Sequence, residues 1–159
     1  MQNEEKFNLI LTESYKRMHL YTCAEASLQG LLKLWEIDQK ILTWATAGYM
    51  GAIQSGKTTC GLLIGSSCAM GFRLGQNLNS IPEDSSKIRN KNIRMVKRFY
   101  KAFIKEFGST ECKELCKIEF SNPEDAANYV ISQGWKSTCD IFLNWVMKYF
   151  NELTENNKI

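Results

Sequence analysis

Cysteine is the residue type in this 159-residue chain whose chemistry stands out, with six copies at Cys23, Cys60, Cys68, Cys112, Cys116 and Cys139. Thiolates bind soft metals and iron–sulfur clusters, and pairs of thiols form redox-active disulfides. No CxxC or CxxCH spacing occurs, so zinc-ribbon, thioredoxin and covalent haem motifs are absent. The single histidine, His19, also rules out a histidine-rich metal site.

The spacing of the cysteines limits which of them can act together. Cys112 and Cys116 are four residues apart, so in a helix their Cβ atoms would lie about 5–6 Å apart. A disulfide needs about 3.8 Å, so we expect no bridge between them, although one or both could bind a cluster. Cys60 and Cys68 are eight residues apart, roughly 12 Å along a helix. We therefore predict that Cys68 is an inert buried thiol.

A second motif, GAIQSGKT at residues 51–58, has the G-x-x-x-x-G-K-T pattern of the phosphate-binding P-loop. A P-loop follows a buried strand and works with a later acidic residue that binds Mg²⁺. Gly48 stands where that strand should end, and no later apolar run ends in Asp. We interpret the motif as a glycine-rich turn before a helix, and keep a nucleotide-binding P-loop protein as an alternative.

Two glycines, Gly61 and Gly65, lie four residues apart and share one face of the helix expected after Thr58. Glycine lets another backbone or a bulky group approach closely. Two interpretations stay open. The glycines serve the packing of a neighbouring helix, or they leave room for a cluster beside Cys60.

The hydrophobic pattern predicts an all-α fold of about six to eight helices in a single domain that spans residues 1–159. Asn122 followed by Pro123 is typical of a helix start, and Gly108 is typical of a helix end. A loop is expected at 75–86, and no alternating strand pattern or repeat occurs. The expected helices cover about 4–21, 22–35, 39–52, 58–72, 86–107, 111–117, 122–134 and 137–153.

Composition and charge narrow the cellular setting. The chain is 44% hydrophobic and 23% charged, which is ordinary for a soluble globular protein. Its net charge of +3 is low for a nucleic-acid-binding protein. The polar N-terminus is unlike a secretory signal, and the most apolar stretch, 58–72, is too short to cross a bilayer. We expect a cytoplasmic protein that binds neither nucleic acid nor membrane.

The order of the cysteine motifs resembles the C-GCAxxG-C-C family of redox-active proteins. The segments that carry the resemblance are TCAEASLQGLL, TTCGLLIGSSCAMGF, FGSTECKEL and CDIFLNWV, within roughly residues 20–150. Residues 60–65 match the family's Cys-Gly-Ala-x-x-Gly helix turn, except that Leu62 replaces the usual Ala. Relatives include the split-Soret cytochromes, which have haem sites that this chain lacks.

The resemblance implies that four thiols act together. The thiols that would bind the metal are those of Cys23, Cys60, Cys112 and Cys139. Cys116 would be a reserve ligand, and Gly61 and Gly65 would lie beside the cofactor. Four thiolates from separate helices can hold a 2Fe–2S or 4Fe–4S iron–sulfur cluster. They can also bind zinc or work as a metal-free thiol–disulfide protein. Because no catalytic carboxylate or histidine pattern occurs, we expect an electron carrier rather than a stand-alone enzyme.

A basic stripe at spacings of 4, 3, 4, 3 and 4 follows the expected helix 86–107: Lys87, Lys91, Arg94, Arg98, Lys101 and Lys105. It is either a solvated face or the docking face for an acidic redox partner protein. The sequence also leaves a homodimer open. The aromatic residues near the C-terminus are expected in the core rather than at an interface: Trp135, Trp145, Tyr149 and Phe150.

Overall fold

The computed structural model describes residues 2–76 and 86–159, and in these parts of the chain it contains helices and no sheet, which confirms the predicted all-α bundle. The first five elements are α1 (Gln2–Leu20), α2 (Cys23–Leu34), the 3-10 helix η1 (Lys40–Ala45), α3 (Tyr49–Gln54) and α4 (Gly61–Gly75). The others are α5 (Ser86–Phe107), α6 (Cys112–Cys116), α7 (Pro123–Ile131), the 3-10 helix η3 (Gly134–Ser137) and α8 (Cys139–Glu155). Most of the predicted loop 75–86 lies outside the described residues.

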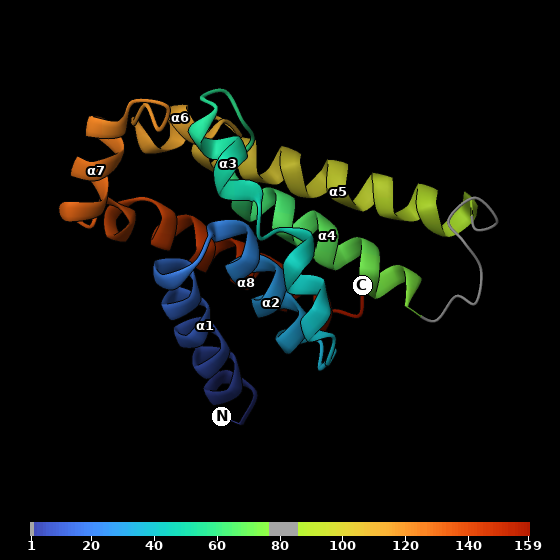
Figure 1. The fold of residues 1–159 in the computed structure, drawn as a ribbon. Helices are drawn as coiled ribbons and strands as arrows, with labels where there is room; N and C mark the ends of the chain where they lie inside the picture. Colours follow the sequence, from blue (N-terminus) through green and yellow to red (C-terminus); the bar gives the residue numbers. More distant parts are fainter. Residues whose placement is uncertain (1, 77–85) are drawn as a thin grey trace.

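Helix α2 is the centre of the bundle and packs against α1, α4 and α8 (Figure 1). Its N-terminus is capped by Thr22, whose hydroxyl oxygen accepts a hydrogen bond of 3.1 Å from the Glu25 backbone N–H. The apolar side chains of α2 are almost fully buried, as Leu28 and Leu31 illustrate. Gly65 of α4 allows the two helices to cross closely, because a Cβ atom there would overlap the carbonyl oxygen of Ala24.

The long helix α5 buries a stripe of aromatic rings against α8. Phe99 and Phe103 are fully buried, and Phe103 and Phe107 pack with ring centroids 4.7 Å apart. Trp145 of α8 lies against the same rings. The helix ends at Gly108, which adopts a positive φ of 83°. This confirms the predicted helix end, and Trp145 packs against the core while part of its surface stays exposed.

The region between α2 and α4 differs from the expected continuous helices. The predicted helix 39–52 is divided into η1 and α3, and α4 begins at Gly61 rather than at Thr58. The cause is a short extended segment, in which Thr59 forms an antiparallel bridge with Glu111. A residue cannot be helical and extended at once, so the helix starts after this bridge.

The P-loop motif does not have the geometry of a P-loop. Residues 51–54 complete helix α3, and Gly56 turns the chain with a positive φ of 108°. No strand precedes the motif in the part of the chain that the structure describes. A P-loop requires a strand, a loop and a helix in that order, so the nucleotide-binding alternative loses its structural basis.

The C-terminal half begins its helices largely as the sequence predicts. Asn122 caps α7, since its side-chain oxygen accepts a 2.9 Å hydrogen bond from the Glu124 N–H, and Pro123 is the first helical residue. The last helix begins at Cys139, because residues 134–137 form the separate turn η3. Among the described helices, none is long and apolar enough to span a bilayer.

Candidate functional site

Four of the six cysteines lie in a small buried cluster at one end of the bundle, where α3, α6 and α7 gather (Figure 1), and Cys60 of the main core joins them through its backbone hydrogen bond to Thr110. They come from separate segments: the starts of α2, α4 and α8, and both ends of α6. The five residues are Cys23, Cys60, Cys112, Cys116 and Cys139. We call them the thiol cluster. The structure therefore brings the four cysteines of the family pattern into one region, together with Cys116.

Backbone pairing joins the segments that carry Cys60 and Cys112. The N–H of Cys60 donates to the carbonyl oxygen of Thr110 at 2.7 Å, and the N–H of Cys112 donates to that of Thr58 at 2.9 Å. Tyr49 of α3 supports this bridge, because its hydroxyl donates to the Thr59 carbonyl oxygen at 2.6 Å. Both thiols are buried, so the bridge fixes two cysteines against the same apolar interior.

The two glycines of the helix-turn motif have different neighbours. A Cβ atom on Gly61 would overlap the sulfur of Cys23, so the missing side chain allows Cys23 to lie against the start of α4. A Cβ atom on Gly65 would overlap the backbone of α2 at Ala24. Gly65 therefore serves helix packing, whereas Gly61 contacts the thiol cluster.

Cys116 and Cys139 form a close pair, with their Sγ atoms 3.7 Å apart. The hydroxyl of Tyr129 lies 3.3 Å from the Cys139 sulfur and 3.8 Å from the Cys116 sulfur. It is also 2.7 Å from the hydroxyl of Thr138. One buried tyrosine hydroxyl thus touches both thiols and a second hydroxyl.

The surroundings disfavour free thiolates. Burial raises the pKa of Cys23 to about 12, and repulsion from Cys139 and Cys116 adds to this. Burial likewise raises the pKa of Cys60. The hydrogen bond with Cys112, followed by burial, raises the pKa of Cys116 to about 11. A thiolate here needs a cation beside it, whereas a protonated thiol or a disulfide is already neutral.

The sixth cysteine is not where the sequence placed it. Cys68 is exposed on α4, so the prediction of a buried thiol is wrong. An eight-residue step along a helix turns by about 80°. Cys68 consequently leaves the face that Leu62 and Leu63 bury, while its neighbours Ala69 and Met70 return to the core.

Sequence reasoning did not single out Tyr129 and Thr138. Tyr129 lies on α7 and Thr138 just before α8, and the turn η3 folds one against the other. A Cβ atom on Gly134 of η3 would overlap the Tyr129 ring. No motif connects Tyr129 with the cysteines, because the contacts arise only when α6, α7 and α8 meet.

The thiol cluster does not close around a single point. All six cysteines are free thiols, and in 2–76 and 86–159 no three or more Cys, His, Asp or Glu side chains are arranged to hold one metal ion. The ligands available in the cluster are soft sulfur atoms without carboxylate or imidazole. This ligand chemistry suits iron–sulfur clusters and zinc, and it is unsuited to magnesium or calcium.

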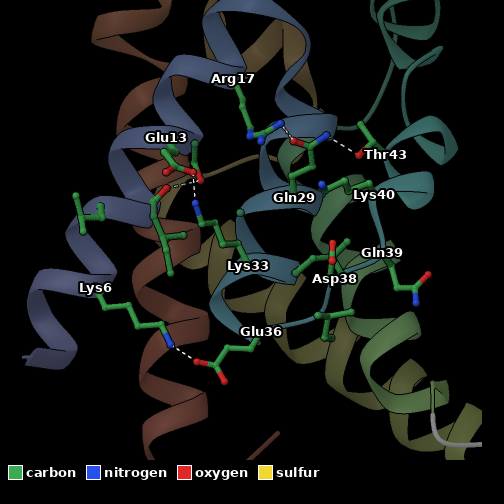
Figure 2. A pocket seen from close by; sticks show the side chains of 16 residues that line it. Lys6, Glu13, Arg17, Gln29, Lys33, Glu36, Asp38, Gln39, Lys40 and Thr43 are labelled. Carbon is green, nitrogen blue, oxygen red and sulfur yellow. Dashed lines mark hydrogen bonds and ion pairs between the residues drawn. The ribbon is translucent and has the colours of Figure 1, made fainter.

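A groove of about 780 Å³ between α1, α2 and η1 is a separate feature (Figure 2). Its charged side chains mostly neutralise one another, with ion pairs between Lys6 and Glu36 and between Lys33 and Glu13. Gln29 connects α1 to η1 by accepting a hydrogen bond from Arg17 and donating one to Thr43. No cysteine lines this groove, so it is distinct from the thiol cluster.

The comparison with protein families agrees with the cysteine pattern. A sequence model described as "Putative redox-active protein (C_GCAxxG_C_C)" matches residues 21–153. The matched range includes every cysteine of the chain. No curated protein and no solved structure matches the chain.

Proposed function

Because the chain belongs to the C-GCAxxG-C-C family of redox-active proteins, we propose that it is an electron carrier with an iron–sulfur cluster. The ligands would be the four cysteines of the family pattern: Cys23, Cys60, Cys112 and Cys139. The single observation that supports this is the convergence of thiols from separate helices, with no disulfide between them, at one end of the bundle.

The four sulfur ligands suit either an iron–sulfur cluster or a zinc ion. A bound iron–sulfur cluster would accept and return one electron. The missing side chain at Gly61 leaves the Cys23 sulfur next to the start of α4. The redox description of the family favours a cluster over zinc, because zinc does not change its oxidation state.

The chain's own residues would position the ligands and limit the access of water. Ile53 and Tyr129 are buried beside Cys112 and Cys116, and Phe120 packs at 5.2 Å from the Tyr129 ring. An apolar surrounding of this kind influences the potential of a redox centre. The same apolar surrounding raises the pKa values of the thiols, so a thiolate form there needs a bound cation.

The test is anaerobic purification followed by a visible absorption spectrum and by analysis of iron and zinc. We expect broad absorbance with stoichiometric iron, and its loss in Cys60→Ser. Cys68→Ser is the matched control, since it removes an exposed thiol outside the cluster. Colourless protein with stoichiometric zinc would make the site structural, and colourless metal-free protein would reject both metal centres.

An acidic redox partner would dock on α5. Its basic side chains from Lys87 to Lys105 are exposed, and none forms an ion pair with another described residue. We expect the double charge reversal Arg94→Glu and Arg98→Glu to slow electron transfer with an acidic carrier such as flavodoxin. The same variant should weaken the dependence of the electron-transfer rate on salt concentration. Lys16→Glu with Lys148→Glu is the control, and equal rates in both double variants would reject this docking face.

A metal-free thiol–disulfide protein is the second candidate function. The observation that favours it is the 3.7 Å separation of the Cys116 and Cys139 sulfurs. This candidate predicts a colourless protein whose thiols titrate in a two-electron step. Redox titration of the metal-free protein, with thiols counted at each potential, separates it from the one-electron carrier.

A further inference from the structure

The geometry points to a thiol–disulfide exchange site formed by Cys116 and Cys139, with the Tyr129 hydroxyl as its positioning group. Its substrate class is a disulfide, either a small one such as oxidised glutathione or one in a partner protein. Cys116 lies outside the four-cysteine pattern of the family, so this site adds a function to a thiol otherwise held only in reserve. The inference rests on the proposed redox role of the thiol cluster.

The first support is the distance between the two sulfurs. They lie 3.7 Å apart, although 23 residues separate them in the sequence. A disulfide bond is about 2.05 Å long, so closing it requires an approach of somewhat under 2 Å. Cys116 is the last residue of the five-residue helix α6, and Cys139 is the first residue of α8. Both are at helix ends, where small backbone adjustments disturb the fewest helical hydrogen bonds.

The alternative partner of Cys116 is Cys112, one helical turn away. A bond between these two would have to form within α6, where Cβ atoms four residues apart are separated by about 5–6 Å. A disulfide needs about 3.8 Å. The helical geometry of α6 therefore selects Cys139 over Cys112 as the bonding partner of Cys116.

The second support is the arrangement of hydroxyl groups around the pair. Thr138 donates to the Gly134 carbonyl oxygen at 3.0 Å, so its oxygen can accept the Tyr129 hydroxyl proton at 2.7 Å. The Tyr129 oxygen can then accept a hydrogen bond from the S–H of Cys139 at 3.3 Å. When that thiol loses its proton, the Tyr129 O–H can turn and donate to the sulfur instead.

The ring of Tyr129 is fixed, which makes its hydroxyl a reliable positioning group. Phe120 packs edge-on at 5.2 Å, and Trp135 lies at 6.4 Å. The backbone at Gly134 leaves no space for even a methyl group beside the ring. The hydroxyl consequently stays next to both sulfurs whether they are reduced or bonded to each other.

The exchange proceeds in two balanced steps. Cys139 is partly exposed as a residue, whereas Cys116 is buried, and we assign the first attack on the external disulfide to Cys139. Its sulfur attacks one sulfur of that disulfide, forming a mixed disulfide and releasing the first thiol. Cys116 then attacks the Cys139 sulfur, forming the internal disulfide and releasing the second thiol. Two electrons and two protons pass from the cysteines to the external disulfide.

The test maps the bond by mass spectrometry in the full-length protein, both as purified without oxygen and after removal of iron by a chelator. The protein is equilibrated in glutathione buffers of increasing oxidation, acid-quenched, alkylated and digested with trypsin. Cleavage after Lys113 separates the two cysteines of α6, giving peptides 106–113 and 114–117, while Cys139 lies in 137–148.

We expect peptide 114–117 to be linked to 137–148 in the oxidised iron-free protein. The link should be absent in Cys116→Ser and retained in Cys112→Ser and Cys68→Ser. A dominant link to 106–113, or no link at any oxidation level in the wild type, would overturn the exchange site. The wild-type map does not depend on how any variant folds. Iron measured in the same preparation shows separately whether the proposed cluster fails.

Tyr129→Phe tests the positioning role, because it keeps the ring and removes only the hydroxyl. The hydroxyl hydrogen bonds favour the reduced thiols over the disulfide, whose sulfurs offer no S–H. We expect the equilibrium to shift about fivefold toward the disulfide, as expected for one lost hydrogen bond. Tyr49→Phe is the control, since the Tyr49 hydroxyl bonds to Thr58 and Thr59 and to no sulfur of the described residues. Equal shifts in both variants would overturn the role of Tyr129.

Discussion

The two hydrophobic clusters of the molecule are held together by different kinds of contact. The larger one fills the bundle and includes interlocked aromatic rings of α5 and α8, such as Phe99 and Phe150 with centroids 4.8 Å apart. The smaller one is built from Ile53, Cys112, Cys116 and Tyr129, with more cysteines at its edge. Its elements are short, and hydrogen bonds to hydroxyl and sulfur atoms connect them.

This difference separates stability from chemistry. Rings packed without polar partners contribute through buried apolar area and dispersion. Thiols contribute less area, but they can bind a metal or bond to one another with only small adjustments at the helix ends that carry them. We infer that the larger cluster sets whether the protein folds, and that the thiol cluster sets its redox state. The following variants test whether the two properties are separable.

The largest effect is expected from Phe103→Ala in the larger cluster. Phe103 is fully buried and contacts Phe107, Phe142 and Trp145. Its truncation should lower the free energy of unfolding by about 3–5 kcal/mol, because it removes buried area and leaves a cavity. Urea denaturation followed by circular dichroism measures this change.

Ile104→Ala is the matched control on the same helix, since Ile104 is 45% exposed. It should change the free energy of unfolding by less than about 1 kcal/mol. Folded Phe103→Ala protein should still form the same cysteine link as the wild type. Loss of that link at full helix content would show that the two clusters are not separable.

The second variant, Gly65→Ala, acts where the two clusters meet. The added methyl group would overlap the carbonyl oxygen of Ala24, one residue after Cys23. Because a backbone atom cannot move aside as a side chain can, we expect a loss of about 3 kcal/mol. Gly75→Ala on the same helix is the control, since a Cβ atom there meets nothing within 4 Å. If both variants unfold at the same urea concentration, α2 and α4 do not cross as closely as the structure has them.

Features that depend on neighbouring residues could be predicted from the sequence, whereas contacts between distant segments could not. The helix end at Gly108 and the cap at Asn122 depend on residue types within a few positions, so the local sequence predicts them. The family pattern predicted which cysteines belong together. The Cys116–Cys139 pair and the Tyr129 contacts depend on how α6, α7 and α8 meet, and no local spacing encodes that. The Thr59–Glu111 bridge was missed for the same reason.

The third prediction concerns the alkaline stability of the reduced, metal-free protein. Burial raises the pKa of Cys23 to about 12 in the folded state, whereas an unfolded thiol titrates near 8.5. Above that pH the unfolded chain loses its proton first and binds fewer protons than the native state. Stability should therefore be constant below about pH 8 and should fall as pH rises toward the folded pKa, by about 1.4 kcal/mol per pH unit for each such thiol.

Urea denaturation between pH 7 and about pH 9.5 measures most of this slope while the lysines, whose pKa is about 10.4, remain largely protonated. The decline of the free energy of unfolding with pH should be less steep in Cys23→Ala than in the wild type, by about the contribution of one thiol. A variant of the exposed Cys68 serves as the comparison. An identical slope in Cys23→Ala and wild type would mean that the Cys23 thiol is not shielded from water. Metal-loaded protein should not show the same decline, because its ligands are already deprotonated.

The smallest effect is expected from the loss of a helix N-cap. The caps of α7, in the thiol region, and of α2, in the main core, allow the two regions to be compared. Asn122→Ala removes the exposed cap of α7, the helix that carries Tyr129, and should cost about 1 kcal/mol. Thr22→Ala removes the buried cap of α2 and also the hydrogen bond of 2.9 Å that the Thr22 hydroxyl donates to the Glu25 carboxylate. It should cost more, because a buried carboxylate oxygen then lacks a partner.

Hydrogen exchange should show faster opening of α7 alone in Asn122→Ala and of the whole bundle in Thr22→Ala. Uniform opening in both variants would mean that the thiol end unfolds only together with the aromatic core, and that its chemistry cannot change independently of the fold.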